Sequence, residues 1–177
     1  MKHLFENWRE YLKEESQPVD GDDDKNQVSG IIIVRQQQDG SYRTLALLPG
    51  KEVTSDDGKS SYQFYGTYDI PKGHAKKGEP TLAAAFREAG EETGYSASDL
   101  DFRWGSESFT SSKGKKVGTF FLASVELDPT IVRNPENGML EHGAFKWITF
   151  DEMLKRVGRF WFSDAVRWAK EIVPVSY

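Results

Sequence analysis

The order of apolar and polar positions predicts short β-strands around one well-defined helix. Stretches rich in β-branched and aromatic residues are typical of strands. Six such stretches are predicted as strands: residues 28–36, 42–48, 62–70, 100–110, 115–127 and 143–150. Asp39 and Gly40 form a common hairpin-turn pair between the first two. Residues 50–61 are predicted as an exposed loop.

A helix is predicted over residues 81–93, where good helix formers follow Pro80. Its apolar stripe consists of Leu82, Ala85, Phe86 and Ala89. Gly94 can end the helix in a left-handed conformation. Gly90 lies inside the helix, where glycine costs about 1 kcal/mol relative to alanine, and the sequence gives no reason for it.

Two further helices are predicted over 151–158 and 163–173, with Ser163 as the N-cap of the second. Strands around a central helix, followed by more helices, predict an α/β sandwich with a mixed β-sheet. This domain is expected to span residues 28–177. Residues 1–27 are expected to form an amphipathic helix and an acidic linker.

The composition narrows the classes of function. The chain has 177 residues, with 23 Lys and Arg against 28 Asp and Glu, for a net charge of −5. This mild acidity argues against nucleic-acid binding through bulk charge, although it leaves room for a local basic patch. Cysteine is absent, which excludes disulfides and thiolate sites and fits a cytoplasmic setting. No apolar run approaches the roughly 18 residues of a membrane helix, so no membrane partner is expected.

Three glutamates lie close together on the predicted central helix. Glu88 is followed at helical spacing by Glu91 and Glu92, so their carboxylates occupy neighbouring surface positions. A solvated charged face, partly neutralised by pairing of Arg87 with Glu91, would explain the cluster. The alternative is a metal site, because the glycine-containing segment 71–79 lets the backbone approach the helix closely. Carboxylates and carbonyls together suit Mg²⁺.

The spacing of these residues resembles the Nudix box. The matching positions are Gly73, Glu79, Arg87, Glu88, Glu91, Glu92 and Gly94. Two positions depart mildly from the pattern, since Ala89 is small and Tyr95 is aromatic. Nudix enzymes hydrolyse nucleoside diphosphates linked to another group, using Mg²⁺ or Mn²⁺. The resemblance therefore implies this activity, this cofactor and a Nudix-type α/β/α sandwich.

The resemblance also implies roles for single residues. The expected metal ligands are Glu88, Glu91, Glu92 and the carbonyl of Gly73. Glu79 would be an outer metal ligand or an orienting carboxylate, and Arg87 would position a glutamate through a salt bridge.

The general base differs among members of this family. Glu141 precedes the strand that carries Trp147, and similar loops in the family often supply a base or a further metal ligand. Glu141 is therefore the first candidate for the base and Glu88 the alternative, although an ordinary exposed loop glutamate would fit the same pattern. The neighbouring His142 is expected to be exposed and inert.

Lysines and aromatic residues are candidates for substrate contacts. Lys72, Lys115 and Lys116 are expected to bind phosphates, as are Lys76, Lys77 and Lys113, although a basic hairpin turn would also explain the "KGKK" stretch. Five aromatic residues are candidates for stacking on a nucleotide base, with core packing as the alternative for each: Tyr62, Phe64, Tyr65, Trp104 and Phe109.

The entry to the box, "PKGH", resembles that of diadenosine polyphosphate and diphosphoinositol polyphosphate hydrolases. The predicted substrate is therefore a nucleoside or dinucleoside polyphosphate. RNA 5′ ends, nucleotide sugars, ADP-ribose and oxidised nucleotides are alternatives. A non-catalytic ligand sensor of this fold would usually lack some of the box glutamates, so their presence favours an enzyme.

The N-terminal segment has two interpretations. Its apolar stripe (Leu4, Phe5, Trp8, Tyr11 and Leu12) could dock on the domain or bind a partner groove. The segment also resembles the short head-targeting peptides of large tailed bacteriophages. Those peptides end in a Leu-any-Glu cleavage signal, which Leu12, Lys13 and Glu14 match. In that case the protein would be packaged in a phage virion.

Overall fold

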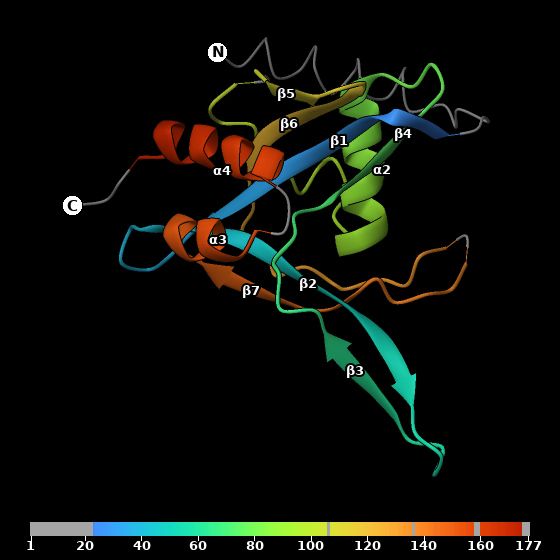
Figure 1. Ribbon diagram of the computed structural model, residues 1–177. Helices are drawn as coiled ribbons and strands as arrows, with labels where there is room; N and C mark the ends of the chain where they lie inside the picture. The colour runs from blue at the N-terminus through green and yellow to red at the C-terminus, as the bar shows by residue number, and fades with distance from the viewer. Residues whose placement is uncertain (1–22, 106, 136, 158–159, 175–177) are drawn as a thin grey trace.

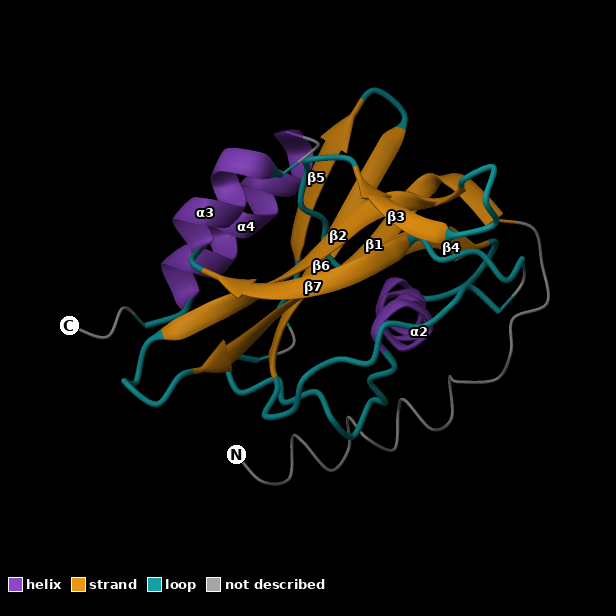
Figure 2. Cartoon of the chain, turned by 90° about the horizontal axis from the view of Figure 1, so that it is seen from below, coloured by secondary structure: helices purple, strands orange, loops and turns teal. Residues whose placement is uncertain are grey.

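The computed structural model describes residues 23–105, 107–135, 137–157 and 160–174. These residues form a seven-stranded mixed sheet with helices on both faces (Figure 1, Figure 2). The strands are β1 (Asp23–Gln36), β2 (Tyr42–Thr54), β3 (Ser60–Phe64), β4 (Lys72–Lys76), β5 (Phe109–Lys113), β6 (Lys116–Ser124) and β7 (His142–Ile148). The helices are α2 (Thr81–Thr93), α3 (Phe150–Arg156) and α4 (Phe160–Ile172). The predicted α/β sandwich with a mixed sheet is confirmed.

Strand β1 is central to the sheet. It runs parallel to β6 along Gln27–Val34, while its other edge pairs antiparallel with β4 and then with β2. Figure 2 shows α2 on one face of the sheet, with α3 and α4 on the other. Because both faces of β1 are covered, its apolar run does not alternate with polar residues. Ile32 packs in the core under α4, and Ile31 packs in the core under α2.

Helix α2 has the bounds that the sequence predicts. Pro80 is its N-cap, and Gly94 ends it in the left-handed conformation with a φ of 71°. Ala85 and Ala89 are fully buried against the sheet. Gly90 gains a partial explanation, because a Cβ there would lie 3.3 Å from the Tyr95 carbonyl oxygen, a tight contact.

Two segments predicted as loops are strands. Residues 50–61 were expected to be an exposed loop, but β2 continues to Thr54 and pairs with β3. The two strands form a polar ribbon that projects from the body of the sheet (Figure 1). Residues 72–76, within the segment expected to be a glycine-containing loop, are β4, which pairs with β1. In both cases the backbone ladder forms without the apolar alternation that normally reveals a strand.

Further boundaries differ from the predictions, among them that of the predicted strand 62–70, which ends as β3 at Phe64. Residues 23–27, expected in the acidic linker, already belong to β1. The predicted strand 100–110 is mostly a connecting segment, and regular pairing with β6 begins only at Phe109. Helix α4 begins at Phe160, so Ser163 is not an N-cap, and Phe162 in this first turn already packs edge-on against Phe120 in the core. None of the described helices is long and apolar enough to cross a membrane.

Candidate active site

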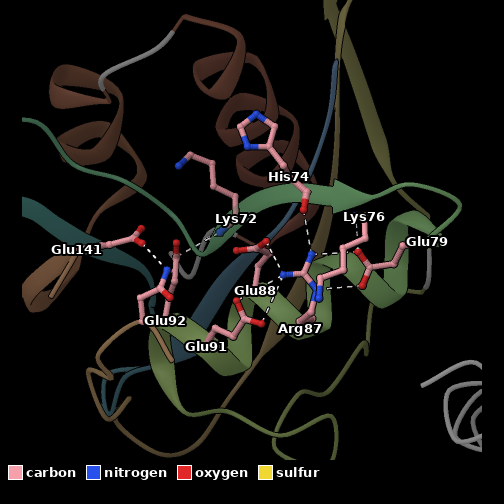
Figure 3. Close-up of polar contacts among 10 residues, drawn as sticks. Lys72, His74, Lys76, Glu79, Arg87, Glu88, Glu91, Glu92 and Glu141 are labelled. Carbon is pink, nitrogen blue, oxygen red and sulfur yellow. Dashed lines mark hydrogen bonds and ion pairs between the residues drawn. The ribbon is translucent and has the colours of Figure 1, made fainter. Parts of the chain in front are cut away.

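The segment from β4 to α2 brings the acidic residues together (Figure 3). Gly73 on β4 pairs with Ser29 on β1 and lies directly against the side chain of Glu88. A Cβ at position 73 would lie only 2.1–2.3 Å from the carboxylate atoms of Glu88. Only glycine therefore leaves room for this carboxylate beside the strand.

Arg87 connects the start of the helix with its carboxylates. Its guanidinium donates two hydrogen bonds of 3.0 Å to the carboxylate of Glu79 and one of 2.9 Å to the carbonyl of His74. It also donates to Glu88 at 2.7 Å and, more weakly, to Glu91 at 3.4 Å. One planar group thus fixes the helix to β4 and orients two of the clustered carboxylates.

Arg87 and Glu79 stabilise each other in the charged form. Burial alone would lower the pKa of Arg87, but its bonds to Glu79 and Glu88 raise it above the ordinary value. Burial alone would raise the pKa of Glu79, yet bonds from Arg87 and from the backbone N–H of Lys76 hold it below the ordinary value. Glu79 therefore stays ionised and holds Arg87 in place.

Glu88 is a buried carboxyl group that ionises reluctantly. Its side chain is 13% exposed. Burial raises its pKa from 4.5 to about 7, even though Arg87 opposes this shift. A nearby positive charge stronger than one shared guanidinium would be needed to keep Glu88 fully ionised.

Glu92 is buried still more deeply. Burial raises its pKa well above 4.5, and the neighbouring charges of Lys72 and Asp69 act in opposite directions on it. Its carboxylate accepts a hydrogen bond of 3.3 Å from the backbone N–H of Lys72 on β4. Glu88 and Glu92 are therefore two neighbouring buried carboxyl groups beneath β4, and ionising either of them costs free energy.

Glu141 approaches this cluster from the segment that joins β6 to β7. Its carboxylate accepts a hydrogen bond of 2.7 Å from the side-chain amide of Asn134 (Figure 3). One pocket is lined by Glu88, Glu91, Glu92, Val132, Asn134, Glu141 and His142. The structure thus brings all four candidate carboxylates, three from α2 and one distant in sequence, to the same pocket.

Comparison with known proteins gives the family of this arrangement. The protein-family model described as the NUDIX domain matches residues 25–169 of this chain. The chain belongs to the Nudix family. The Nudix box is therefore the segment from Gly73 to Tyr95, spanning β4, the turn after it, and α2.

Individual Nudix proteins show further similarity. An asymmetrical bis(5′-nucleosyl)-tetraphosphatase of Rattus norvegicus is 35% identical over 85 residues, which are 46% of this chain and 55% of the rat protein. The match thus spans about half of that relative. An Ap4A hydrolase of C. elegans, solved as a binary complex, has a TM-score of 0.58 and 20% identity, covering 81% of this chain and 96% of its own. The M. smegmatis Nudix hydrolase RenU also has a TM-score of 0.58, with 17% identity, covering 83% and 85%. The two structures show a shared fold.

Two residues beside the Nudix box have surroundings that the sequence did not predict. His142 was expected to be exposed, but it is 5% exposed and its Nε2 lies 3.9 Å from the carboxylate of Asp69. Lys72, expected to contact phosphate, donates from Nζ to Asp69 at 2.7 Å and lies over the ring of Phe162. The two residues share this carboxylate because Asp69 and His142 both pair with β2, and Lys72 follows Asp69 by three positions.

The other predicted substrate contacts lie outside the pocket lining. Lys115 and Lys116 are exposed on the hairpin of β5 and β6, which contributes no residue to the pocket.

Most of the aromatic residues predicted to stack on a base are instead packed against other rings or bound to the backbone. Phe64 stacks on Tyr68, Trp104 packs edge-on against Tyr42, and Phe109 packs against Trp168. Tyr65 is exposed, while the hydroxyl of Tyr62 is bound to two carbonyls.

The residues of the Nudix box fit a divalent cation by their chemistry. Oxygen donors are what Mg²⁺ and Mn²⁺ prefer, and the buried carboxyls of Glu88 and Glu92 lack a compensating charge strong enough to keep their pKa values low. Within the described part of the chain, no three acidic or histidine side chains already converge as ligands would. Arg87 binds Glu88 and Glu91 from one side, so an ion would have to draw these two carboxylates together from the other.

Proposed function

We propose that this protein is a divalent-metal-dependent pyrophosphohydrolase that cleaves a phosphoanhydride bond in nucleoside diphosphates linked to another group. The observation that carries this proposal is the pocket in which Glu88, Glu91 and Glu92 face Glu141. Two of these carboxyls are buried at a free-energy cost, as their raised pKa values show. A purely structural helix would gain nothing from burying them.

The chain's residues have distinct roles in this proposal. Glu88, Glu91 and Glu92, with the backbone carbonyl of Gly73, would hold Mg²⁺ or Mn²⁺. The bound ion would neutralise phosphate charge and lower the pKa of a water molecule. Arg87 keeps Glu88 oriented from one side. Positioning and electrostatics of this kind supply most of the catalysis in phosphoryl chemistry.

Glu141 is the proposed general base. It reaches the pocket from the β6–β7 connection rather than from α2, and its carboxylate would accept a proton from the attacking water molecule. Its hydrogen bond from Asn134 orients the carboxylate and keeps one oxygen available as an acceptor. Glu88 is the alternative base. In the Glu141→Gln variant, kcat should fall more than KM rises. If Glu141→Gln instead has the kcat and KM of the wild type while Glu88→Gln is inactive, Glu88 is the base.

The proposed substrate class is nucleoside or dinucleoside polyphosphates. Its support is the "PKGH" entry to the box, the names of the rat and C. elegans relatives, and the exposed lysines Lys77, Lys115 and Lys116, although these lysines lie outside the pocket lining. Each extra phosphate adds negative charge for such lysines to contact.

A panel assay tests both the activity and the substrate. Purified protein would be incubated with diadenosine tetraphosphate, ADP-ribose, a UDP-sugar and triphosphorylated RNA, with Mg²⁺ or with EDTA. We expect the highest kcat/KM for diadenosine tetraphosphate and no turnover in EDTA. If ADP-ribose, the UDP-sugar or the RNA 5′ end has a higher kcat/KM than diadenosine tetraphosphate, the proposed substrate class is wrong and the better substrate defines the class. Binding without turnover of any compound would favour a ligand sensor.

The role of residues 1–27 stays a prediction, because residues 1–22 lie outside the described part of the chain. Mass spectrometry of the protein from its native source separates the two interpretations. A chain that begins after Glu14 would support targeting to a virion. A chain that begins at Met1 or Lys2 would support a docked or partner-binding helix in the cytoplasm.

A further inference from the structure

The β2–β3 hairpin lies against the segment that carries Glu141. In the antiparallel register Glu52 is opposite Tyr62, so both side chains project from the same face of the hairpin. Figure 1 shows this hairpin projecting from the sheet beside the β6–β7 connection. Two sets of contacts join the hairpin face to that connection.

The first set of contacts is made by Tyr62. Its hydroxyl lies 2.9 Å from the carbonyl oxygen of Glu141 and 3.0 Å from that of Leu48. The backbone N–H of Gly50 also donates to the Glu141 carbonyl, at 3.3 Å. The ring of Tyr62 lies so close to Gly143 that a Cβ there would be 2.2–2.5 Å from ring atoms. The carbonyl of Glu141 and the backbone that follows it at Gly143 therefore lie against this one tyrosine.

The second set of contacts is made by Arg133. Its guanidinium binds the carboxylate of Glu52 through two hydrogen bonds of 2.7 Å and the carbonyl of Gly138 through one of 3.3 Å. The next residue, Asn134, donates from its side chain to the carboxylate of Glu141 at 2.7 Å. The pair between Glu52 and Arg133 thus anchors the amide that orients the Glu141 carboxylate.

We infer that the β2–β3 hairpin is a brace that sets the position of Glu141, with Tyr62 and Arg133 as positioning residues for the reaction. This inference rests on the proposed function, in which Glu141 is the general base. A long connection without regular structure costs conformational entropy to order, and these contacts offset that cost. A base that is displaced by about 1 Å loses much of its effect, so the brace acts on kcat.

The test is a double-mutant cycle on the full chain with Mg²⁺ and diadenosine tetraphosphate. Tyr62→Phe removes one hydroxyl and keeps the ring, and Arg133→Met removes the ion pair and keeps the length of the side chain. Each should lower kcat about two- to tenfold, the worth of one or two hydrogen bonds, with little change in KM. In the Glu141→Gln background, the same substitutions should change kcat by less than about 1.5-fold, because there is no base left to position.

A matched control separates positioning from general loss of an ion pair. Arg167→Met breaks the pair with Asp164, whose side chains are 59% and 43% exposed, similar to 54% and 39% for Arg133 and Glu52. This control should leave kcat unchanged. The reversed pair, Glu52→Arg with Arg133→Glu, should recover most of the kcat lost in Arg133→Met. Amide hydrogen exchange gives a readout independent of turnover, since the Gly50 N–H should exchange faster in Tyr62→Phe.

The outcomes distinguish this inference from the proposed function. A wild-type protein that hydrolyses no compound of the panel would overturn both. An active wild-type protein in which Tyr62→Phe and Arg133→Met keep full kcat would overturn the inference alone. So would equal losses in both backgrounds, a rise in KM at unchanged kcat, or a Glu141→Gln variant with normal turnover. A loss of kcat that disappears in the Glu141→Gln background would support it.

Discussion

Replacement of Glu88 by glutamine should make the metal-free protein more stable at pH 8, although it removes a proposed metal ligand. Glu88 is buried, and its pKa is raised from 4.5 to about 7 in the folded chain. Between these values the folded state keeps a proton that the unfolded state has lost. Stability of the wild-type protein therefore falls as pH rises through this window. Glutamine has nearly the shape of the protonated carboxyl and does not titrate.

The size of the effect follows from the two pKa values. Each pKa unit corresponds to about 1.4 kcal/mol, so ionising Glu88 in the fold costs roughly 3 kcal/mol. The variant should gain that amount over the wild type between pH 4.5 and pH 8, which corresponds to roughly 6–12 °C in Tm for a chain of this length. Loss of the Glu88 charge also lowers the pKa of Glu92, which adds to the gain in the same direction.

Urea unfolding in EDTA at pH 5 and pH 8 measures this difference. The control is Glu171→Gln, at an exposed position on α4, which should track the wild type at both pH values. Addition of Mg²⁺ at pH 8 should then stabilise the wild type more than Glu88→Gln, because binding to the folded state adds to its stability. A difference between Glu88→Gln and wild type that is the same at pH 5 and pH 8 would refute the assigned burial cost.

Three further substitutions address the other parts of the Nudix box. Gly73→Ala places a methyl group against the Glu88 carboxylate, so Mg²⁺ affinity by calorimetry and kcat should each fall at least about tenfold, and unchanged affinity would contradict the close approach. Glu92→Gln should lower turnover at least about a hundredfold with the far-UV circular dichroism unchanged; normal turnover would remove Glu92 from the site. Arg87→Lys cannot reproduce the paired bonds to Glu79, so Tm should fall by several degrees and kcat with it, while a wild-type Tm would show that the network contributes little.

The Nudix box could be predicted from sequence because its geometry is local. Strand, turn and helix follow one another within Gly73–Tyr95, so the spacing of the residues already determines which carboxylates share a face. The sequence does not explain why position 73 is a glycine. The structure does, because the missing Cβ makes room for the carboxylate of Glu88.

The surroundings of Glu141 could not be predicted in the same way. Its hydrogen bond from Tyr62 joins residues 79 positions apart, and the pair between Glu52 and Arg133 spans 81. The sequence places Tyr62 among the stacking candidates, since an aromatic side chain in a predicted strand gives no sign that its hydroxyl contacts two carbonyls. The predicted exposure of His142 was wrong because a sequence does not show that His142 and Asp69 both pair with β2, which brings their side chains together.

The central place of β1 has a consequence for how the chain folds during synthesis. Its parallel partner β6 ends at Ser124, so a growing chain exposes one whole edge of β1 until most of the domain has left the ribosome. That edge runs through Ile31, Ile32 and Ile33, a β-branched stretch whose free backbone groups invite pairing with other chains. Contacts of such long sequence separation also form slowly. Truncation before β6 should therefore yield aggregates rather than a smaller folded unit, although the Nudix box itself would be complete.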